Sequence, residues 1–361
     1  MSRNRYEARQ AAAAAFIDEE GLDAVLLEDT EGRRCSSIRY LTGLPQDGLL
    51  FIFRNGRTVL VPWDIIMAGK TATASRIVPL TDFDRKPEKA VRGVLALEGA
   101  AAGAKVEVSP GTPYPVFQKL KKAVTGATLS CPEKGIEHRI EESRARKDPG
   151  EIEDIRRAAS ITSEVMDLLI RRIESGTITT ELEAAMFLEQ AGRERGSEGT
   201  GFETLAAGPS RSFGIHAFPS YTGGPIGGDG FSIIDFGFRY NGYTSDVTVS
   251  IARGRLSAKQ EKMATLVQKT HDAAVAAAVP GACIREICTM VDDTFAGEGF
   301  FMPHSLGHGI GLDAHEAPMV STRAEAEAVL EPGMIITIEP GLYAEDAGGI
   351  RLENDVLITP G

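Results

Sequence analysis

The chain has 361 residues, of which 42% are hydrophobic and 25% charged, a composition typical of a soluble globular protein with room for two domains. Acidic residues outnumber basic ones by 51 to 39, and the net charge of −12 argues against a nucleic-acid partner, which would favour a basic surface. The sequence has no run of about 18 apolar residues, so no membrane span is expected.

The beginning of the chain predicts a small α/β domain. Residues 5–20 follow a helical pattern, and residues 24–27 form a short apolar strand. Apolar runs at 49–53 and 58–61 are joined by an Asn-Gly pair, which predicts a hairpin. Two further helices and a strand near 105–108 complete this α/β N-terminal domain.

A charged, broken stretch precedes the second region, which predicts an α+β domain. We place the boundary so that the domains are residues 1–135 and 136–361. Helical patterns are predicted over residues 151–174, 180–195, 257–278 and 284–298. Between and after these helices lie short strands and Gly-rich turns, and the candidate functional residues are on the strands.

The cysteines and the N-terminus favour a cytoplasmic protein. Cys35, Cys131, Cys283 and Cys288 show no zinc-finger or redox spacing, so we expect no disulfide framework and a reducing compartment. The N-terminus begins basic but soon becomes acidic, which indicates an amphipathic helix and not a signal peptide.

Four carboxylates in the second half follow apolar strands or lie beside small residues. Asp235 and Asp246 are eleven positions apart across a Gly-containing turn, Glu339 follows Ile335-Ile-Thr-Ile338, and Glu353 ends Gly-Gly-Ile-Arg-Leu-Glu. Turn or capping chemistry explains each one alone. No Lys or Arg adjoins Asp235 or Glu339, so together they predict buried carboxylates that need a cation. With the imidazole of His308, they suit Mn²⁺, Co²⁺ or Zn²⁺.

Other candidates surround this set. In an extended segment His304 and His308 point to one face and would enter the same cleft. His138 and His271 are interpreted as structural or surface residues, and His271, in an Ala-rich helix, is expected to face solvent. Arg351 lies two residues before Glu353, where it either binds a substrate carboxylate or forms a salt bridge that orients the ligand.

Four motifs closely resemble those of the pita-bread metallopeptidases, a family of prolidases, Xaa-Pro aminopeptidases and methionine aminopeptidases, with the metal-free creatinases as relatives. These are Asp-Phe-Gly followed by Gly-Tyr-Thr-Ser-Asp, His-Ser-Leu-Gly-His-Gly-Ile-Gly-Leu, Ile-Glu-Pro-Gly-Leu-Tyr and Gly-Gly-Ile-Arg-Leu-Glu. Arg39-Tyr-Leu-Thr-Gly43 resembles an N-terminal signature of the proline-specific branch. The resemblance covers nearly the whole chain and implies a pita-bread fold for the catalytic domain.

The resemblance also implies a set of site residues and a cofactor. The cofactor is two divalent metal ions, manganese with cobalt or zinc as alternatives, and the implied ligands are Asp235, Asp246, His308, Glu339 and Glu353. Glu339 would also be the general base. By the same resemblance His216, His304 and His315 position substrate and stabilise the tetrahedral intermediate, and Arg351 matches an Arg of the proline-specific branch that we assign to substrate binding.

The expected function is hydrolysis of the Xaa-Pro bond in dipeptides or short peptides by a homodimer. Three alternatives stay open: an Xaa-Pro aminopeptidase on longer peptides, a pita-bread hydrolase or lyase acting on a non-peptide small molecule, and a catalytically silent binding protein. Two positions depart from the family pattern, because Val249 stands where an Arg is frequent and Ser37 where an Asn is frequent. The sequence therefore predicts the metal site more firmly than the substrate.

Overall fold

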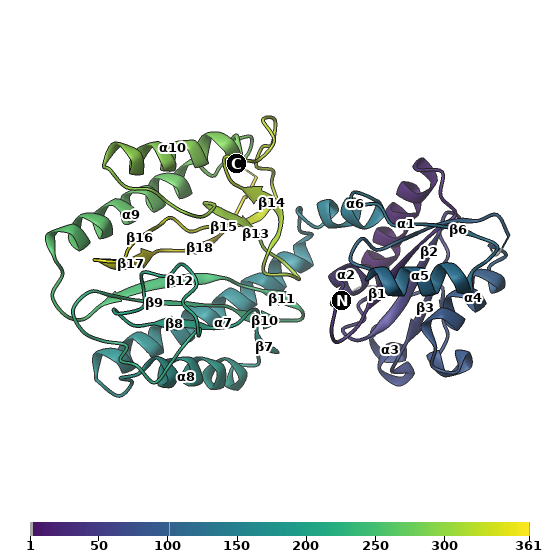
Figure 1. The fold of residues 1–361 in the computed structure, drawn as a ribbon, viewed down its shortest axis with the longest axis horizontal. Helices are drawn as coiled ribbons and strands as arrows, with labels where there is room; N and C mark the ends of the chain where they lie inside the picture. The colour runs from purple at the N-terminus through teal and green to yellow at the C-terminus, as the bar shows by residue number, and fades with distance from the viewer. Residues whose placement is uncertain (1–2, 101, 361) are drawn as a thin grey trace. The chain divides into compact units, whose positions relative to one another are not determined.

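The chain divides into two compact units, Met1–Ser143 and Arg144–Gly361, and the computed structural model describes residues 3–100 and 102–360 (Figure 1). The division falls after the expected boundary between residues 135 and 136. The reason is helix α6 (Ile136–Ser143), which packs on α1 (Arg3–Glu19) and α2 (Ser36–Thr42) and so belongs to the first unit.

The first unit is built on a six-stranded sheet in the order β4-β3-β2-β1-β5-β6. Its strands are β1 (Ala24–Asp29), β2 (Gly48–Phe53), β3 (Thr58–Pro62), β4 (Arg76–Ile77), β5 (Lys105–Val108) and β6 (Thr128–Ser130). Strand β1 lies between β2, to which it is antiparallel, and β5, to which it is parallel. The predicted helix over 5–20, the strand at 24–27 and the hairpin are confirmed by α1, β1 and the β2–β3 pair.

Helices cover both faces of this sheet, which explains why β2 is buried along its whole length. Side chains alternate between the faces of a strand. Leu49 and Phe51 pack in one apolar cluster with α4 (Pro87–Leu97) and α5 (Tyr114–Ala123). Leu50 and Ile52, both fully buried, point to the opposite face, where α1 contacts β2. Sequence patterns did not predict the short helices α2, α3 (Ile65–Thr71) and α6.

The second unit encloses its strands between two helix pairs (Figure 1). Helices α7 (Pro149–Glu174) and α8 (Glu181–Glu194) pack together on one side, and α9 (Ala258–Ala277) and α10 (Ile284–Gly297) pack together on the other. Capping boxes begin α7, α8 and α9, in which the N-cap side chain and the N3 side chain satisfy each other's backbone N–H groups. The four helices confirm the expected α+β unit.

Short strands between these helix pairs form several small sheets. They are β7 (Gly199–Thr200), β8 (Leu205–Ala207), β9 (Phe231–Phe236), β10 (Phe238–Tyr240), β11 (Tyr243–Thr244), β12 (Val247–Ala252), β13 (Gly307–Gly309), β14 (Glu316–Val320), β15 (Ile335–Ile338), β16 (Gly341–Ala344), β17 (Gly348–Arg351) and β18 (Asn354–Leu357). One sheet has the order β12-β9-β8 and another the order β14-β13-β15-β18. A bridge between Thr248 and Glu353 joins the two groups of strands.

Close backbone approach explains the glycines of the β13 motif. A Cβ atom on Gly307 would lie 2.0 Å from the carbonyl oxygen of Thr337, and one on Gly309 would lie 2.0 Å from that of Ala317. A side chain at either position would therefore push β13 away from β15 or β14. The glycines keep the strand that carries His308 against its neighbours.

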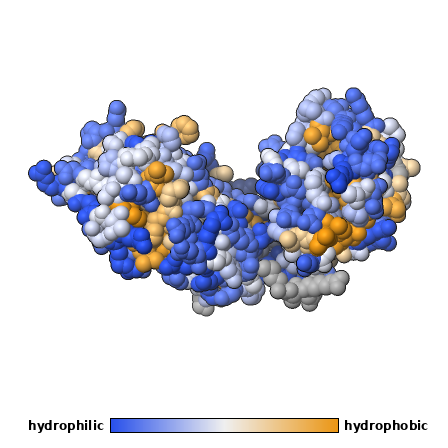
Figure 2. Space-filling view, turned by 90° about the horizontal axis from the view of Figure 1, so that it is seen from below, coloured by the Kyte–Doolittle hydropathy of each residue, from blue (hydrophilic) through white to orange (hydrophobic). Residues whose placement is uncertain are grey.

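One residue, His271, is buried where the sequence predicts that it faces solvent. His271 was expected to face solvent, but it is 7% exposed on the face of α9 that packs into the core, so that expectation was wrong. Figure 2 shows a largely hydrophilic face on each unit, with small apolar areas between polar residues. Across residues 3–100 and 102–360, no helix has both the length and the apolar character needed to cross a membrane.

Candidate metal centre

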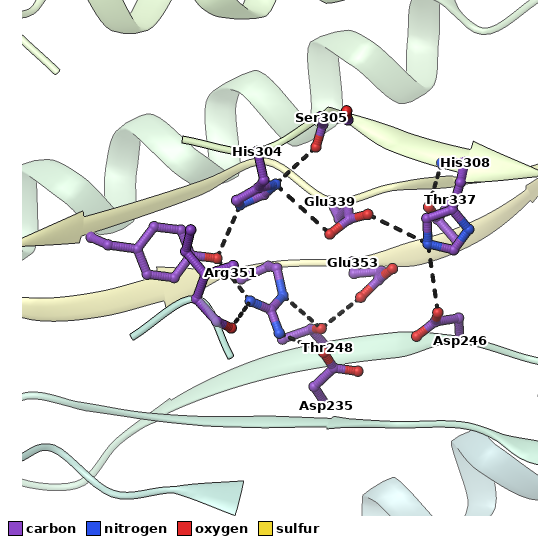
Figure 3. Close-up of polar contacts among 12 residues, drawn as sticks. Asp235, Asp246, Thr248, His304, Ser305, His308, Thr337, Glu339, Arg351 and Glu353 are labelled. Atoms are coloured by element: carbon purple, nitrogen blue, oxygen red, sulfur yellow. Dashed lines mark hydrogen bonds and ion pairs between the residues drawn. The ribbon is translucent and has the colours of Figure 1, made fainter. Parts of the chain in front are cut away.

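Residues from five separate strand ends meet between the helix pairs of the second unit (Figure 3). Asp235 lies near the end of β9, Asp246 immediately precedes β12, His308 is on β13, Glu339 follows β15, and Glu353 lies between β17 and β18. Strands β9 and β12 are antiparallel with Thr248 opposite Asp235, which brings Asp246 close to Asp235. Strand pairing therefore places all five predicted residues in one region.

The separations between these donor atoms suit a cation site. Asp246, His308 and Glu353 each offer a ligand atom, and the three atoms lie within 4.8 Å of one another. The Nε2 atom of His308 lies 3.8 Å from an Asp246 carboxylate oxygen and 3.6 Å from a Glu339 carboxylate oxygen. Glu339 thus extends the group of three toward His304, whose Nδ1 atom is 3.9 Å from its other oxygen.

Two buried oxygens of this cluster lack protein partners among the described residues. Among the described residues, Oδ1 of Asp235 and Oδ1 of Asp246 are buried and accept no hydrogen bond. A buried carboxylate oxygen without a donor is costly, whereas a cation would satisfy it directly. Hard oxygen donors with one imidazole fit divalent ions such as Mn²⁺, Co²⁺ or Zn²⁺. The donor set therefore fits the metal ions that the sequence implied.

Crowding of carboxylates changes their acidity. Burial, and then the charges of Glu353 and Asp235, raise the pKa of Asp246 well above its usual range. Burial, and then the charges of Glu339 and Asp235, do the same to the pKa of Glu353. Burial also raises the pKa of Glu339 to about 7. Such shifts show that these acids resist ionising together unless positive charge is supplied.

The imidazole of His308 is oriented to present a lone pair to the carboxylates. Its Nδ1 atom lies 3.1 Å from the carbonyl oxygen of Gly309, an acceptor, so the proton belongs on Nδ1. Nε2 then carries the lone pair and faces Asp246 and Glu339. Burial lowers the pKa of His308 to about 4, which keeps the ring neutral near pH 7. A neutral ring with Nδ1 bound to a carbonyl is the usual state of a metal-binding histidine.

Arg351 is the cation that the fold places in this cluster. It is 1% exposed, and its Nη2 atom lies 2.5 Å from Oδ2 of Asp235. Its other donors bind the hydroxyl of Thr248, the hydroxyl of Tyr343 and the carbonyl oxygen of Ile215. Of the two interpretations left open by the sequence, these contacts fit a salt bridge that orients a ligand carboxylate. Substrate binding by Arg351 stays a prediction.

A chain of hydrogen bonds connects Arg351 to His304. Arg351 donates to the Tyr343 hydroxyl at 2.8 Å, and that hydroxyl lies 3.1 Å from Nε2 of His304. Nδ1 of His304 lies 2.8 Å from the carbonyl oxygen of Ser305, an acceptor, so Nδ1 donates and Nε2 accepts from Tyr343. Burial lowers the pKa of His304 to about 4. His304 and His308 do enter one site, but His304 lies in a bend before β13 and not in an extended strand.

The two remaining histidines are exposed and lie on loops. His315 immediately precedes β14, and its ring centroid lies 4.1 Å from that of His308. His216 is in the segment between β8 and β9. Burial, followed by the charge of His216, lowers the pKa of His315. The structure therefore brings together all the predicted site residues.

Sequence reasoning missed four side chains that support the site. Thr248 donates to Glu353 at 2.6 Å, Thr337 accepts from the backbone N–H of His308, and Tyr343 links Arg351 to His304. Asp355 is half-buried and accepts the backbone N–H of Asp246 at 3.1 Å. Tyr343 lies within the Ile-Glu-Pro-Gly-Leu-Tyr motif, and Asp355 is two residues after Glu353, so both had a weak signal in the sequence.

Comparisons with known proteins cover almost the whole chain. A family model described as metallopeptidase family M24 matches residues 153–360, and one described as the creatinase/prolidase N-terminal domain matches residues 9–146. The chain is 36% identical to an Xaa-Pro dipeptidase of Pyrococcus furiosus over 95% of this chain and 93% of the relative.

Solved structures give the same result. The prolidase from Pyrococcus horikoshii OT3 is similar with a TM-score of 0.83 and 28% identity, over 98% of this chain and 95% of that one. The X-Pro aminopeptidase from Thermotoga maritima is similar with a TM-score of 0.82 and 25% identity, over 97% of this chain and 94% of that one.

Proposed function

This chain belongs to metallopeptidase family M24, and from that membership we propose that it hydrolyses the Xaa-Pro bond of dipeptides or short peptides with two divalent metal ions. The family and the similar structures confirm the expected combination of a creatinase-like N-terminal domain with a pita-bread catalytic domain. Similar proteins named as Xaa-Pro dipeptidase and prolidase support the substrate class.

One observation carries the proposal: Asp246, His308 and Glu353 converge, with Asp235 and Glu339 beside them, and leave buried carboxylate oxygens without partners. Asp235, Asp246, His308, Glu339 and Glu353 would hold the ions. When bound, the two ions would supply an activated water molecule and polarise the scissile carbonyl group. Manganese is our first choice, with cobalt or zinc as alternatives, because the donors are mostly oxygen.

The protein's own groups would move protons and position the peptide. We assign Glu339 as the general base, because its carboxylate lies beside the cluster, 3.6 Å from Nε2 of His308, where it can take a proton from a water molecule held by the ions. Burial keeps His304 neutral and the Tyr343 hydroxyl orients its ring, so His304 serves best as a fixed contact for substrate. His216 and His315 are exposed beside the cluster, where they would position the substrate and donate hydrogen bonds to the developing oxyanion.

The test is an assay of an Xaa-Pro dipeptide panel with and without Mn²⁺, together with metal analysis. We expect wild-type protein to bind about two ions per chain and to cleave the Xaa-Pro bond. Asp246→Asn and Glu339→Gln should abolish cleavage while circular dichroism shows an intact fold. Full turnover by a rigorously metal-free enzyme would contradict the proposal. Cleavage of only non-peptide amides would favour the small-molecule alternative.

A second candidate, an Xaa-Pro aminopeptidase on longer peptides, is favoured by the burial of Arg351. A dipeptide presents a free carboxylate directly after proline, and binding it to Arg351 would contribute about 1.5–3 kcal/mol. The guanidinium is 1% exposed and already bonded to Asp235, Thr248, Tyr343 and Ile215. That arrangement leaves little of the group for a substrate.

Comparing Xaa-Pro dipeptides, Xaa-Pro amides and tripeptides on wild-type and Arg351→Met protein separates the two candidates. If Arg351 binds the substrate carboxylate, dipeptides should exceed amides by roughly ten-fold or more, and Arg351→Met should erase that ratio. If Arg351 braces Asp235, the variant should lower kcat for every substrate and leave the ratio unchanged.

We also propose that the protein is a cytoplasmic homodimer. The compartment is proposed because the four cysteines are free, and the homodimer because the chain resembles homodimeric prolidases. Sedimentation equilibrium measures the assembly directly, and a monomer at micromolar concentration would contradict it.

A further inference from the structure

Glu316, the residue after His315, is the buried anion of an ion network outside the metal cluster. Its side chain is 4% exposed, and the side chains of Arg144 and Lys147 are 5% and 1% exposed. The Arg144 guanidinium binds one Glu316 oxygen and lies 2.7 Å from the carboxylate of Asp313. Nζ of Lys147 lies 3.4 Å from the other Glu316 oxygen. None of these side chains belongs to the proposed ligand set.

The same carboxylate fixes the loop that leads to His315. Glu316 accepts the backbone N–H of Asp313 at 3.0 Å, and the Asp313 carbonyl accepts the N–H of Gly311 at 3.0 Å. The Gly311 carbonyl in turn accepts the N–H of Thr244 at 2.8 Å. A Cβ atom on Gly311 would meet the Glu316 carboxylate at 2.5 Å, so the loop lies directly against this side chain. His315 is thus held between fixed points on both sides.

The two basic residues, Arg144 and Lys147, lie in a segment whose backbone is bound to residues 333 and 334. The backbone N–H of Lys147 binds the carbonyl oxygen of Gly333 at 2.9 Å, and Arg146 forms a β-bridge with Met334. Strand β15 begins directly after Met334 and ends before Glu339. Residues 144–147 therefore join the His315 loop to the strand that delivers the proposed general base.

We infer that Arg144, supported by Lys147, positions His315 for catalysis by holding Glu316, so that both are positioning residues of the proposed hydrolysis. The inference rests on the proposed function. His315 is exposed and its ring contacts that of His308, so a shift of residues 311–316 moves the imidazole relative to the metal cluster. Arg144 matters more than Lys147, since it reaches both Glu316 and Asp313 and its contacts are shorter.

Arg146, two positions after Arg144, provides a matched control. Arg146 has a side chain that is 66% exposed and pairs at 3.1 Å with Glu331, outside the His315 loop. Arg144→Gln should lower kcat for an Xaa-Pro dipeptide by about 10-fold or more, because small displacements of catalytic groups slow reactions strongly. Arg146→Gln should stay within about two-fold of wild type, since surface ion pairs contribute little. Metal content should be unchanged in both.

A double variant distinguishes positioning from general destabilisation. Once His315 is removed, Arg144 has no catalytic group left to position, so Arg144→Gln/His315→Ala should be no slower than His315→Ala. Losses that multiply would overturn the inference. Arg144→Lys, which keeps the charge, should recover part of the rate, and it replaces the Gln variant in every comparison if that variant does not fold.

Hydrogen exchange gives a readout that does not depend on activity. In the full-length protein, amides of residues 311–316 should exchange faster in Arg144→Gln than in wild type or Arg146→Gln, with other segments unchanged. Unchanged protection would overturn the inference. If wild-type protein fails to cleave any Xaa-Pro substrate, the proposed function fails, but the exchange experiment still decides whether Arg144 holds this loop.

Discussion

Individual carboxylates at the centre hold their protons more tightly than ordinary acids when no metal is bound. Burial is the first cause, and it raises the pKa of both Glu339 and Asp355 to about 7, while Asp246 and Glu353 are raised further by neighbouring anions as well. The histidines shift in the opposite direction, because burial lowers the pKa of His304 and His308 to about 4.

These shifts predict how the stability of the metal-free protein depends on pH. The acids bind protons in the folded state that they lose on unfolding, so their contribution to stability is complete below about pH 4.5 and is lost as pH rises through about 7. The histidines have the opposite effect on stability between about pH 4 and 6.5, because in that range the unfolded chain binds protons that the folded rings do not. Above pH 6.5 the acid effect remains alone, so stability should fall toward about pH 8.

Thermal unfolding in EDTA measures this effect. A loss of about 2 kcal/mol between pH 6.5 and about 8 would lower Tm by about 4–8 °C. Saturating Mn²⁺ should remove or reverse the fall, because the ion favours ionised carboxylates. A metal-free Tm that stays constant or rises over this interval would contradict the pKa shifts.

For single residues, the sequence motifs predicted which side chains lie in the site but not which of them bind each other. The five candidate ligands, His304 and His315 could be named from motifs, because each lies in a short, distinctive pattern. The pairing of Arg351 with Asp235 could not, since the two residues come from β17 and β9 and meet only through strand packing. His271 shows the same limit, because its helix has alanines on several faces and gives no clear apolar side.

Among the elements, the segment between β8 and β9 carries His216 and is closed by one buried carboxylate. Glu181, at the start of α8, is 1% exposed and accepts the backbone N–H of Gly208 at 2.7 Å. It also accepts the N–H of Thr222 at 2.7 Å and the Thr222 hydroxyl at 2.6 Å, and it pairs with Arg211. Residues 208–222, which include His216, are therefore attached to this one side chain at both ends.

Glu181→Gln should loosen this segment and lower kcat/KM by about 10-fold, because charge-assisted hydrogen bonds contribute about 1.5–3 kcal/mol each. Metal content should not change, since none of the five proposed ligands lies in residues 208–222. Glu189→Gln is the control, as Glu189 lies on the same helix but pairs only with Arg193 at the surface. Equal activity of the two variants would show that the anchoring does not matter.

Long periodic helices were predictable at the element scale, and short ones were not. Helices α7 to α10 run for 14 to 26 residues, long enough for a periodic apolar pattern to appear in the sequence. Helices α2, α3 and α6 have only 7, 7 and 8 residues, too few for a periodic pattern to appear. The boundary between units falls after residue 143 and not after 135, because α6 packs on α1 and α2.

The whole molecule combines two units with separate apolar cores. One cluster joins the sheet of the first unit to α4 and α5, and the clusters of the second unit involve only residues after position 144. Two units with their own cores are expected to unfold as distinct steps. The proposed metal ligands all belong to the second unit.

Calorimetry should therefore resolve two transitions, and Mn²⁺ should raise only one of them. Ligands stabilise the folded state that binds them, so an excess of about 100 times the Kd adds about 2.7 kcal/mol to the unit that holds the site. A fragment of residues 144–361 identifies that transition. A single transition that shifts as a whole would show that the units unfold together.

The buried guanidinium of Arg351 has a consequence for the order in which ions enter. It offsets one of the four carboxylates, so the proposed centre carries three negative charges in excess once all four have released their protons. The first divalent ion is attracted by three excess negative charges and neutralises two of them. The second ion is attracted by the one that remains and leaves the centre with one positive charge in excess. Near unit charges attract by about 1–4 kcal/mol at 4 Å, so titration calorimetry should give two dissociation constants that differ by at least about ten-fold. One shared constant would mean that the charges are balanced by groups outside this cluster.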